Sequence, residues 1–309
     1  MRAGATRRHG VPAGPLHFSR AMSEELEERP LTARERWQRR AVWVAKHSVM
    51  LAFVYVLIVI AARSLHRRVL YQPPEEPSLL ALAEGATILK AQASDGVAVH
   101  AIRYEAPNAA RTRARTVVVF HGNAETAESS GALARLLLKR GLSVVVPEYR
   151  GYGRSRPGTP TEDGLYRDAE AVLDALVKEG IPREQTVLWG QSLGGGVAVE
   201  MAKRGHGSRL VLVAPFTSTV ELASRIMPVL PAPLVMLDRF DNLAKAPHVE
   251  APALIVHGDR DDVIPMELGE RLARAFPKGR FVKIDGGHHN DLYKNASALT
   301  ELLGHASGG

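Results

Sequence analysis

Short apolar runs alternate with longer amphipathic stretches along most of the chain, from about residue 86 to residue 303. Runs rich in Val, Ile and Leu predict strands, and stretches with apolar residues three or four apart predict helices. The predicted strands cover residues 86–91, 97–104, 116–120, 143–146, 186–189, 210–213, 254–256 and 280–284, and the predicted helices cover 133–139, 165–178, a stretch from 193 onward, 267–275 and 296–303. The first two strands suit an antiparallel pair. The alternation after them predicts an α/β fold with a mostly parallel sheet and helices on both faces.

A uniformly apolar segment precedes this alternation. Residues 49–62 are apolar without a break, and residues 41–45 extend the segment to 22 residues, interrupted only by Lys46, His47 and Ser48. This length approaches the roughly 20 residues that cross a bilayer. A buried core helix and a cleaved signal peptide are the alternatives. We expect an uncleaved transmembrane signal-anchor, because basic residues flank the segment and Ile60 stands where cleavage requires a small residue.

These patterns predict the organisation of the chain. Residues 1–40 form a basic segment, which we expect to be disordered. Residues 41–62 form the transmembrane anchor, 63–77 a linker that is Pro-rich over 72–77, and 78–309 the folded domain. Within that domain, residues 215–250 interrupt the alternation with four prolines among apolar side chains. We expect a small cap there, and an ordinary long crossover with a kinked helix is the alternative.

The charge of the chain is concentrated at its N-terminal end. The net charge is +7, of which residues 1–68 carry +8 and residues 69–309 carry −1. A nucleic-acid-binding protein would carry a basic stripe on its folded domain, so we expect no nucleic-acid partner. Five basic residues before the apolar segment and three after it favour a single-pass protein with a cytoplasmic N-terminus and the folded domain on the outer side. The absence of Cys excludes disulfides, thiolate metal sites and a Cys nucleophile.

Residues 190–194 have the sequence Gly-Gln-Ser-Leu-Gly, which fits the G-x-S-x-G nucleophile elbow. A Gly-rich turn with a solvated Ser would also fit five residues with three fixed positions. The context favours the elbow, because a predicted strand ends at Trp189 and a predicted helix begins at Leu193. The sharp turn would lift the Ser192 hydroxyl above the carboxyl edge of the sheet, which makes Ser192 the candidate nucleophile.

Candidate partners for this Ser follow in the expected chain order. A Ser nucleophile needs a base, and the base needs an acid that fixes its tautomer. Residues 257–265 form an acid-rich loop after one predicted strand, and residues 285–291 form a loop with two adjacent imidazoles after the next. Each loop alone would be unremarkable as a solvated turn. Their order after Ser192 predicts a Ser, Asp, His site.

An acyl-transfer site also needs backbone N–H groups that bind the developing oxyanion. One usually belongs to the residue after the nucleophile and the other to an earlier strand end, which makes Leu193 and Asn123 the oxyanion-hole candidates. His121 lies beside Asn123, and we expect it to be structural because the base belongs near the C-terminus. No metal site is expected, since the His residues fall on loops without paired helical spacing.

Several motifs together resemble the α/β-hydrolase domain proteins, in particular their membrane-anchored esterase, lysophospholipase and depalmitoylase-like branch. The matching segments are residues 121–124, 148–155, 164–169, 190–194, 214–218, 238–242, 257–265 and 289–291. The resemblance implies that Ser192 is the nucleophile, Asp261 the acid and His289 the base of the family. Asp259 and Asp262 crowd the acid, and His288 replaces the small residue usual before the catalytic His.

These observations predict a serine hydrolase that cleaves an ester or thioester through an acyl-Ser192 intermediate, without a metal or organic cofactor. The apolar side chains of residues 226–236 favour a lipid-like or other acyl substrate over a polar one. A peptidase that uses the same triad is the alternative within enzymes, because fold and triad serve amide cleavage as well. A catalytically inactive hydrolase-fold binding module is the alternative outside enzymes.

Overall fold

The computed structural model describes residues 31–74, 85–107 and 115–308. Most of the predicted basic segment, residues 1–30, and part of the predicted linker, residues 75–77, lie outside the described residues.

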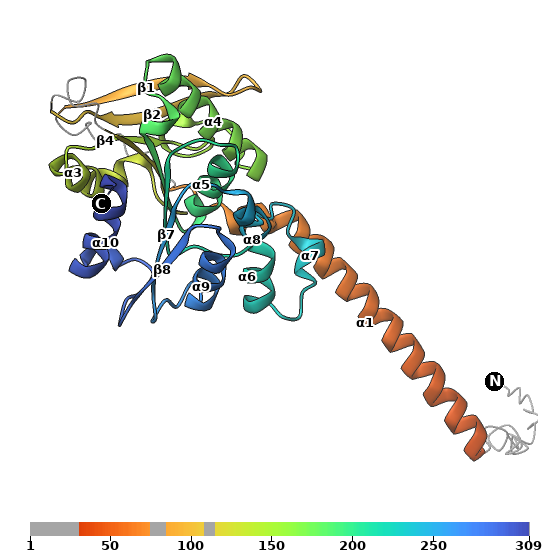
Figure 1. Cartoon of the computed structure of the whole chain (residues 1–309). Coiled ribbons are helices and arrows are strands. Elements are labelled where there is room, and N and C mark those ends of the chain that lie inside the picture. The colour runs from red at the N-terminus through yellow and green to blue at the C-terminus, as the bar shows by residue number, and fades with distance from the viewer. Residues whose placement is uncertain (1–30, 75–84, 108–114, 309) are drawn as a thin grey trace, which may run out of the picture. The chain divides into compact units, whose positions relative to one another are not determined.

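A single eight-stranded sheet forms the centre of the fold (Figure 1). The strands are β1 (Ala86–Gln92), β2 (Ala98–Tyr104), β3 (Thr116–Phe120), β4 (Ser143–Pro147), β5 (Thr186–Gln191), β6 (Arg209–Val213), β7 (Ala253–Gly258) and β8 (Gly279–Ile284). Their order is β1-β2-β4-β3-β5-β6-β7-β8. The strands β1 and β2 pair antiparallel, as predicted, and β2 pairs antiparallel with β4, whereas the pairs from β4 to β8 are parallel. The predicted α/β fold with a mostly parallel sheet is confirmed.

Helices cover both faces of the sheet. The helices α3 (Gly131–Lys139) and α10 (Ala296–Ser307) pack on one face, and α4 (Glu162–Lys178), α5 (Leu193–Lys203) and α9 (Met266–Ala275) pack on the other. Alternate residues of each central strand enter opposite cores, so Val117 and Val119 belong to the core under α3 and α10, while Val118 and Phe120 belong to the core under α4 and α5. Burial on both faces explains the uninterrupted apolar runs in the sequence. Short 3-10 turns complete the fold, at Ala127–Ser130, Gly153–Ser155, Arg183–Gln185, Ala246–His248 and Leu292–Lys294.

Three short helices lie between β6 and β7, where the sequence predicts a cap. They are α6 (Thr219–Ile226), α7 (Ala232–Val235) and α8 (Asn242–Lys245). The side chain of Ser218 caps α6 by accepting a hydrogen bond from the Glu221 N–H. Prolines 228, 231 and 233 fall around α7, which keeps this helix to four residues.

One continuous helix, α1, spans Ala33–Leu70 and is the one helix in the described part of the chain that is long and apolar enough to cross a membrane. A signal sequence near an N-terminus has the same character. The chain divides within α1, between Tyr55 and Val56, into two compact units. In the first unit the large apolar side chains of α1 are exposed, Val49 by 70% and Leu51 by 65%.

The C-terminal turns of α1 belong to the second unit, which also contains the sheet. Val59, Ala62 and Leu70 pack against a small apolar cluster that includes Val235 and Met236. Residues 63–70, which the sequence predicts as the start of a linker, are helical. The folded unit therefore begins before residue 78, inside the helix that carries the apolar segment.

A partly buried ion pair between Arg67 and Asp238 fixes this junction. The Arg67 guanidinium donates two hydrogen bonds to the carboxylate of Asp238, at 2.7 and 3.2 Å, and His66 Nε2 lies 3.5 Å from the same carboxylate. The Asp238 side chain is only 5% exposed. The Arg67 side chain is 40% exposed, so water screens the pair on that side, and Asp238 Oδ1 also accepts from the Glu162 N–H. This pairing therefore holds the end of α1 against the segment that follows α7.

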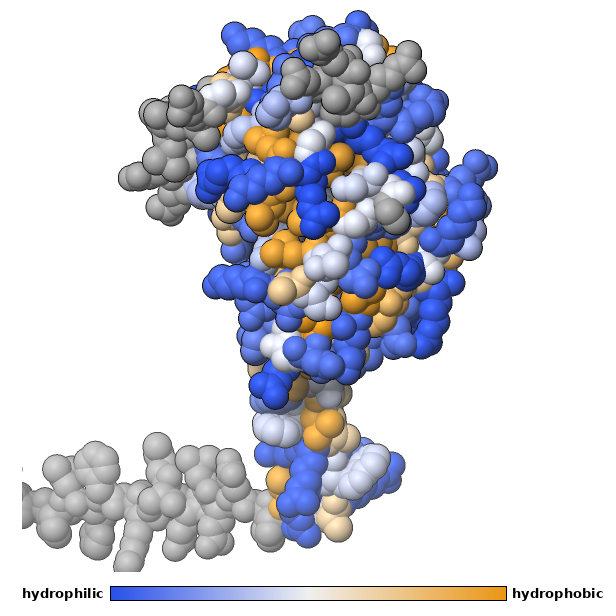
Figure 2. All heavy atoms as spheres, turned by 60° about the vertical axis from the view of Figure 1, so that its left-hand side comes forward, coloured by the Kyte–Doolittle hydropathy of each residue, from blue (hydrophilic) through white to orange (hydrophobic). Residues whose placement is uncertain are grey.

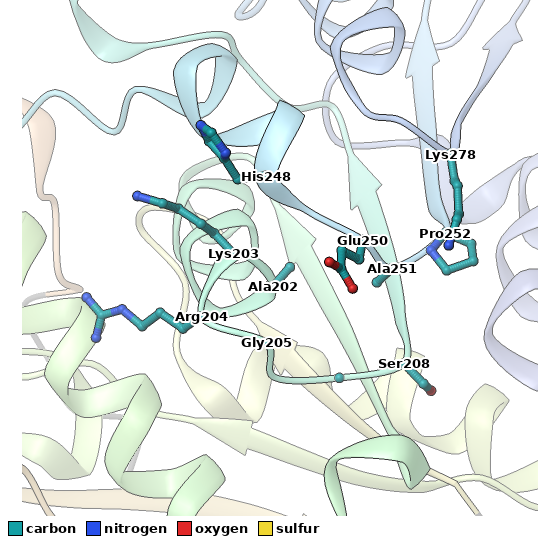
Figure 3. Close-up of a pocket in the computed structure, with 11 residues that line it drawn as sticks. Ala202, Lys203, Arg204, Gly205, Ser208, His248, Glu250, Ala251, Pro252 and Lys278 are labelled. Carbon is teal, nitrogen blue, oxygen red and sulfur yellow. The ribbon is translucent and has the colours of Figure 1, made fainter.

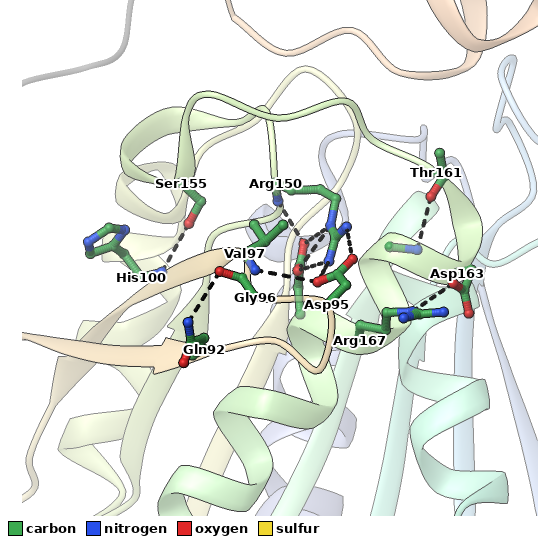
Figure 4. A network of polar contacts seen from close by, with 12 residues as sticks. Gln92, Asp95, Gly96, Val97, His100, Arg150, Ser155, Thr161, Asp163 and Arg167 are labelled. Carbon is green, nitrogen blue, oxygen red and sulfur yellow. Dashed lines mark hydrogen bonds and ion pairs between the residues drawn. The ribbon is translucent and has the colours of Figure 1, made fainter.

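A second buried network centres on Arg150, in the loop after β4 (Figure 4). Its guanidinium donates to both carboxylate oxygens of Asp168 on α4 and to both oxygens of Asp95 in the β1–β2 turn. Asp168 is fully buried and also accepts from the Arg150 backbone N–H. The network ties the antiparallel edge of the sheet to α4, which gives a structural reason for the Arg and Asp in the segments 148–155 and 164–169.

The surface of the folded part is mixed in polarity. Figure 2 shows one face of it, on which blue hydrophilic side chains surround and separate the orange apolar ones. Such a face is ordinary for a domain in water.

Candidate active site

The side chains that the sequence singled out meet at the carboxyl edge of the parallel sheet. Ser192 follows β5, Asp261 follows β7 and His289 follows β8. Parallel strands present their carboxyl ends at one edge, so loops far apart in sequence converge there. The structure places the His289 side chain in contact with both Ser192 and Asp261.

Ser192 occupies the sharp turn between β5 and α5 in a strained conformation, with φ 49° and ψ −117°. A positive φ is costly for a residue with a Cβ, and such strain is found where a nucleophile is held out of the backbone. The residues two positions before and after Ser192, Gly190 and Gly194, must be glycines. A Cβ at Gly194 would lie 2.0 Å from the Phe120 carbonyl oxygen, and one at Gly190 would lie 2.6 Å from the Gly194 carbonyl oxygen.

A chain of two hydrogen bonds links the three side chains. His289 Nε2 lies 3.1 Å from Ser192 Oγ, and His289 Nδ1 lies 2.8 Å from Asp261 Oδ2. Because the Asp261 carboxylate is an acceptor only, Nδ1 carries the ring proton and Nε2 is left to accept the Ser192 proton. This arrangement lets an imidazole act as a base toward the Ser hydroxyl.

Four donors surround the Asp261 carboxylate, whose side chain is fully buried. His289 Nδ1 and His257 Nε2 donate to Oδ2, at 2.8 and 3.0 Å, and the backbone N–H groups of Val263 and Ile264 donate to Oδ1, at 2.9 and 2.8 Å. Burial alone would raise the pKa of Asp261, but the hydrogen bonds from His257 and His289 outweigh it and hold the pKa well below its usual range. Asp261 therefore stays ionised at neutral pH and keeps both imidazoles oriented.

The contact of His257 with Asp261 was not predicted from the sequence. His257 Nε2 faces both Asp261 Oδ2 and the Ile264 carbonyl oxygen, two acceptors, so Nε2 is protonated. The signal available in the sequence was its position, at the end of a buried strand and four residues before the acid.

The neighbours of the three residues face elsewhere. His288 is exposed and only its backbone N–H is used, in a hydrogen bond to Asp291. Asp259 accepts from the Gly286 N–H, and Asp262 is exposed. None of these three side chains contacts Ser192 among the interactions of the described residues.

The oxyanion-hole candidates Leu193 and Asn123 line the same cavity as Ser192. Leu193 is the first residue of α5, so its N–H has no acceptor within the helix. The side chain of Asn123 is held by three hydrogen bonds. Its amide donates to the Leu70 carbonyl, and its oxygen accepts from the Gln72 N–H and the Tyr152 hydroxyl, at 2.8, 2.9 and 2.9 Å. The end of α1 thus braces the loop that carries Asn123.

His121 lies away from this centre. It is 1% exposed, stacks against Tyr149 and contacts Glu148 at 3.3 Å. Burial disfavours charge on the ring, yet the Glu148 carboxylate outweighs it and raises the pKa of His121 above its ordinary value. No contact of the described residues joins His121 to Ser192, so its position is that of a buried structural residue.

A cavity of about 500 Å³ opens beside Ser192. Its walls come from the end of α1, from α6 and α7 and from the loop after β7, and are almost entirely apolar. The lining residues include Leu65, Val69, Leu70, Phe216, Leu222, Ile226, Met227, Leu230, Val235, Met236, Val263 and Ile264. The lining contains no Asp or Glu in the described part of the chain. A cavity of this kind accepts an apolar group and offers no partner for a cationic one.

A second hollow, of about 520 Å³, lies at the opposite edge of the sheet, where α5 ends and β6 begins (Figure 3). Figure 3 shows Lys203 and Arg204 on one side of it and Lys278 on the other. Arg204 is paired with Glu170 and Glu200. Nothing in this hollow forms a nucleophile and base pair.

Over residues 31–74, 85–107 and 115–308, no group of three or more His, Asp or Glu side chains could hold a metal ion.

The chain is similar to several known proteins. Residues 111–240 match the family model described as serine aminopeptidase, S33. An uncharacterized protein of Mycobacterium tuberculosis, Rv2307c, is 33% identical over 247 residues, which cover 78% of this chain and 86% of the relative. The α/β hydrolase domain-containing protein aho-3 of Caenorhabditis elegans is 32% identical over 60% of this chain and 56% of its own length. Among solved structures, the Pyrococcus furiosus esterase Pf2001 superimposes with a TM-score of 0.60 at 16% identity, over 75% of this chain and 100% of the esterase. That likeness concerns the fold.

The burial of Asp261 predicts how the stability of the protein depends on pH. Asp261→Asn should lower the unfolding temperature at neutral pH, because the new NH₂ group would face two N–H donors. The folded pKa of Asp261 lies below its unfolded value of about 3.9, so its contribution to stability is complete above that value and is lost as the pH falls through the folded pKa. Thermal unfolding followed by circular dichroism should show that the difference in unfolding temperature between wild type and variant becomes smaller below about pH 4.

Asp262→Asn, at the exposed neighbour, is the matched control and should leave the unfolding temperature unchanged at every pH. A gap for Asp261→Asn that is equally wide in acid and at neutral pH would contradict the account.

Proposed function

The chain belongs to the α/β-hydrolase family, and from that premise we propose that it is a membrane-anchored serine hydrolase that cleaves esters or thioesters of apolar acyl groups. The observation that carries the proposal is the Ser192, His289 and Asp261 chain of hydrogen bonds at the wall of an apolar cavity. A nucleophile, a base and an acid in this order are what acyl transfer requires.

The reaction would run in two halves. His289 Nε2 takes the proton of Ser192 as Oγ attacks the acyl carbon, and the same proton passes to the leaving alcohol or thiol. Water then attacks the acyl-Ser192 ester, again with His289 as the base, and releases the acid. In both halves the backbone N–H groups of Asn123 and Leu193 would hold the oxyanion. Each such donor typically raises the catalytic rate by about 10²- to 10³-fold. No cofactor enters either half.

An aminopeptidase is the second candidate, because the matched family model carries that description. An aminopeptidase must bind the ammonium group of its substrate, which calls for a carboxylate near the nucleophile. The lining of the cavity, within the described residues, has no Asp or Glu and is rich in Leu, Val, Ile and Met. This lining favours an acyl chain over an amino terminus.

The anchor proposal rests on α1. Its apolar segment continues without interruption into turns that pack on the folded unit, where Val59 and Ala62 join the cluster with Val235 and Met236. A signal peptide is discarded, whereas these turns contribute structure to the site. We therefore favour retention of the helix as a single-pass anchor, with the enzyme's active unit on the outer side of the membrane.

The choice between ester and amide is open to a direct kinetic test. Full-length protein in detergent should hydrolyse p-nitrophenyl esters with a kcat/KM that rises from acetate to decanoate, by about fourfold for each methylene that the cavity buries. Leucine p-nitroanilide should be a far poorer substrate. Ser192→Ala is the control and should abolish ester turnover. Preference for the anilide would establish the peptidase, and no turnover of any substrate would favour a non-catalytic binding module.

The adjacent imidazoles allow a sharper test of the base. His289→Ala should lower kcat by at least about 10³-fold, close to the loss for Ser192→Ala, because members of such a triad act as a unit. His288→Ala is a matched control at the next residue, and it should change kcat far less because its side chain is exposed. Near-normal activity of His289→Ala together with collapse of His288→Ala would shift the assignment by one residue.

A further inference from the structure

Large apolar side chains are exposed on one part of the folded unit. Outside α1, six large apolar side chains of the described residues are exposed, namely Val177, Ile226, Val229, Leu234, Leu237 and Val263. Four of the six belong to the segment of α6 and α7, and Val263 belongs to the loop after β7. Only Val177, on α4, lies elsewhere. Scattered apolar residues are normal on a protein surface, whereas a cluster marks an interaction site.

This cluster borders the mouth of the apolar cavity. Ile226 and Val263 are exposed and also line the cavity, as do Leu65 and Val69 on the last turns of α1. We call the exposed side chains Leu65, Val69, Ile226, Val229, Leu234 and Val263 the rim patch. Its members reach 65% exposure at Ile226 and 79% at Val229. The route into the cavity therefore passes over an apolar surface that faces outward.

The rim patch lies next to the exposed apolar side chains of α1 and to several arginines, a combination that suits contact with lipid. Ala62 ends the apolar segment of α1 and at the same time lines the cavity, and Val56, Leu57, Ile58 and Ile60 before it are exposed in the same helix. Residues 56–72 contain three arginines and no acidic residue. Arg63 donates to the Leu234 carbonyl within the rim patch. Exposed apolar side chains next to arginines suit the boundary between acyl chains and anionic head groups.

We propose that the rim patch docks on the lipid bilayer, so that the mouth of the cavity opens to the membrane and acyl substrates enter from it. This inference rests on the proposed function for its substrate but not for the docking itself. An acyl chain that moves from the bilayer into the cavity leaves one apolar environment for another. The transfer avoids exposing the methylenes of the chain to water.

The docking can be tested without any assay of activity. The native chain has no Cys, so a single nitroxide can be placed on Val229→Cys or, as the matched control, on Val177→Cys in full-length protein. In vesicles of phosphatidylcholine and phosphatidylglycerol, electron paramagnetic resonance measures collisions with oxygen, which concentrates in lipid, and with a water-soluble nickel chelate. Oxygen should dominate at position 229, and the chelate should dominate at position 177.

Two results would overturn the proposal. Chelate access at position 229 equal to that at 177 would place the rim patch in water. Protection of position 229 from both reagents would place it in a protein contact, for example with a second copy of the chain.

A second measurement links the docking to substrate supply. Two turnover rates are compared, that of a long-chain ester embedded in vesicles and that of dissolved p-nitrophenyl acetate. Val229→Asp should lower the ratio of the first rate to the second by about tenfold. Val177→Asp should leave the ratio unchanged. An unchanged ratio in Val229→Asp would contradict entry from the membrane. If wild type hydrolyses neither ester while position 229 still lies in lipid, the proposed function fails and the docking stands.

Discussion

The site depends on the buried carboxylate of Asp261. A carboxylate without water must be matched by donors, and here two imidazoles and two backbone N–H groups supply them. Because His289 donates its Nδ1–H to this carboxylate, its Nε2 faces Ser192 as an acceptor. The acid therefore determines both the tautomer and the direction of the base. Without it, a Ser held in a strained turn would have no group to take its proton.

The parallel sheet and α1 together complete this centre. The sheet delivers Ser192, Asp261 and His289 to one edge from three separate strand ends. The last turns of α1 add a wall of the cavity. Leu70 at the end of α1 and Gln72 just after it hydrogen-bond the side chain of Asn123. A helix that carries an apolar segment long enough for a membrane thus also supports the loop expected to bind the oxyanion. One helix therefore carries the apolar segment and also shapes the site.

Local patterns were enough to predict the strands, the helices and the elbow, because each depends on neighbouring residues. The Gly-x-Ser-x-Gly turn between a strand and a helix is such a pattern, and the resemblance to a known family pointed to Asp261 and His289. The role of residues 63–72 was not predictable in this way. Arg67 pairs with Asp238, which lies 171 positions later in the chain, and no pattern in the neighbouring residues predicts that pairing. The contact of His257 with Asp261 depends likewise on how a loop closes after β7.

The most direct test of the account is to trap the acyl enzyme. Full-length protein mixed with a decanoyl ester, quenched in acid within milliseconds and digested, should yield one peptide that has gained the mass of a decanoyl group. Fragmentation should place the group on Ser192, since a nucleophile beside a base forms the ester before water removes it. An acyl group found only on another residue, or ester hydrolysis with Ser192 never acylated, would contradict the central claim.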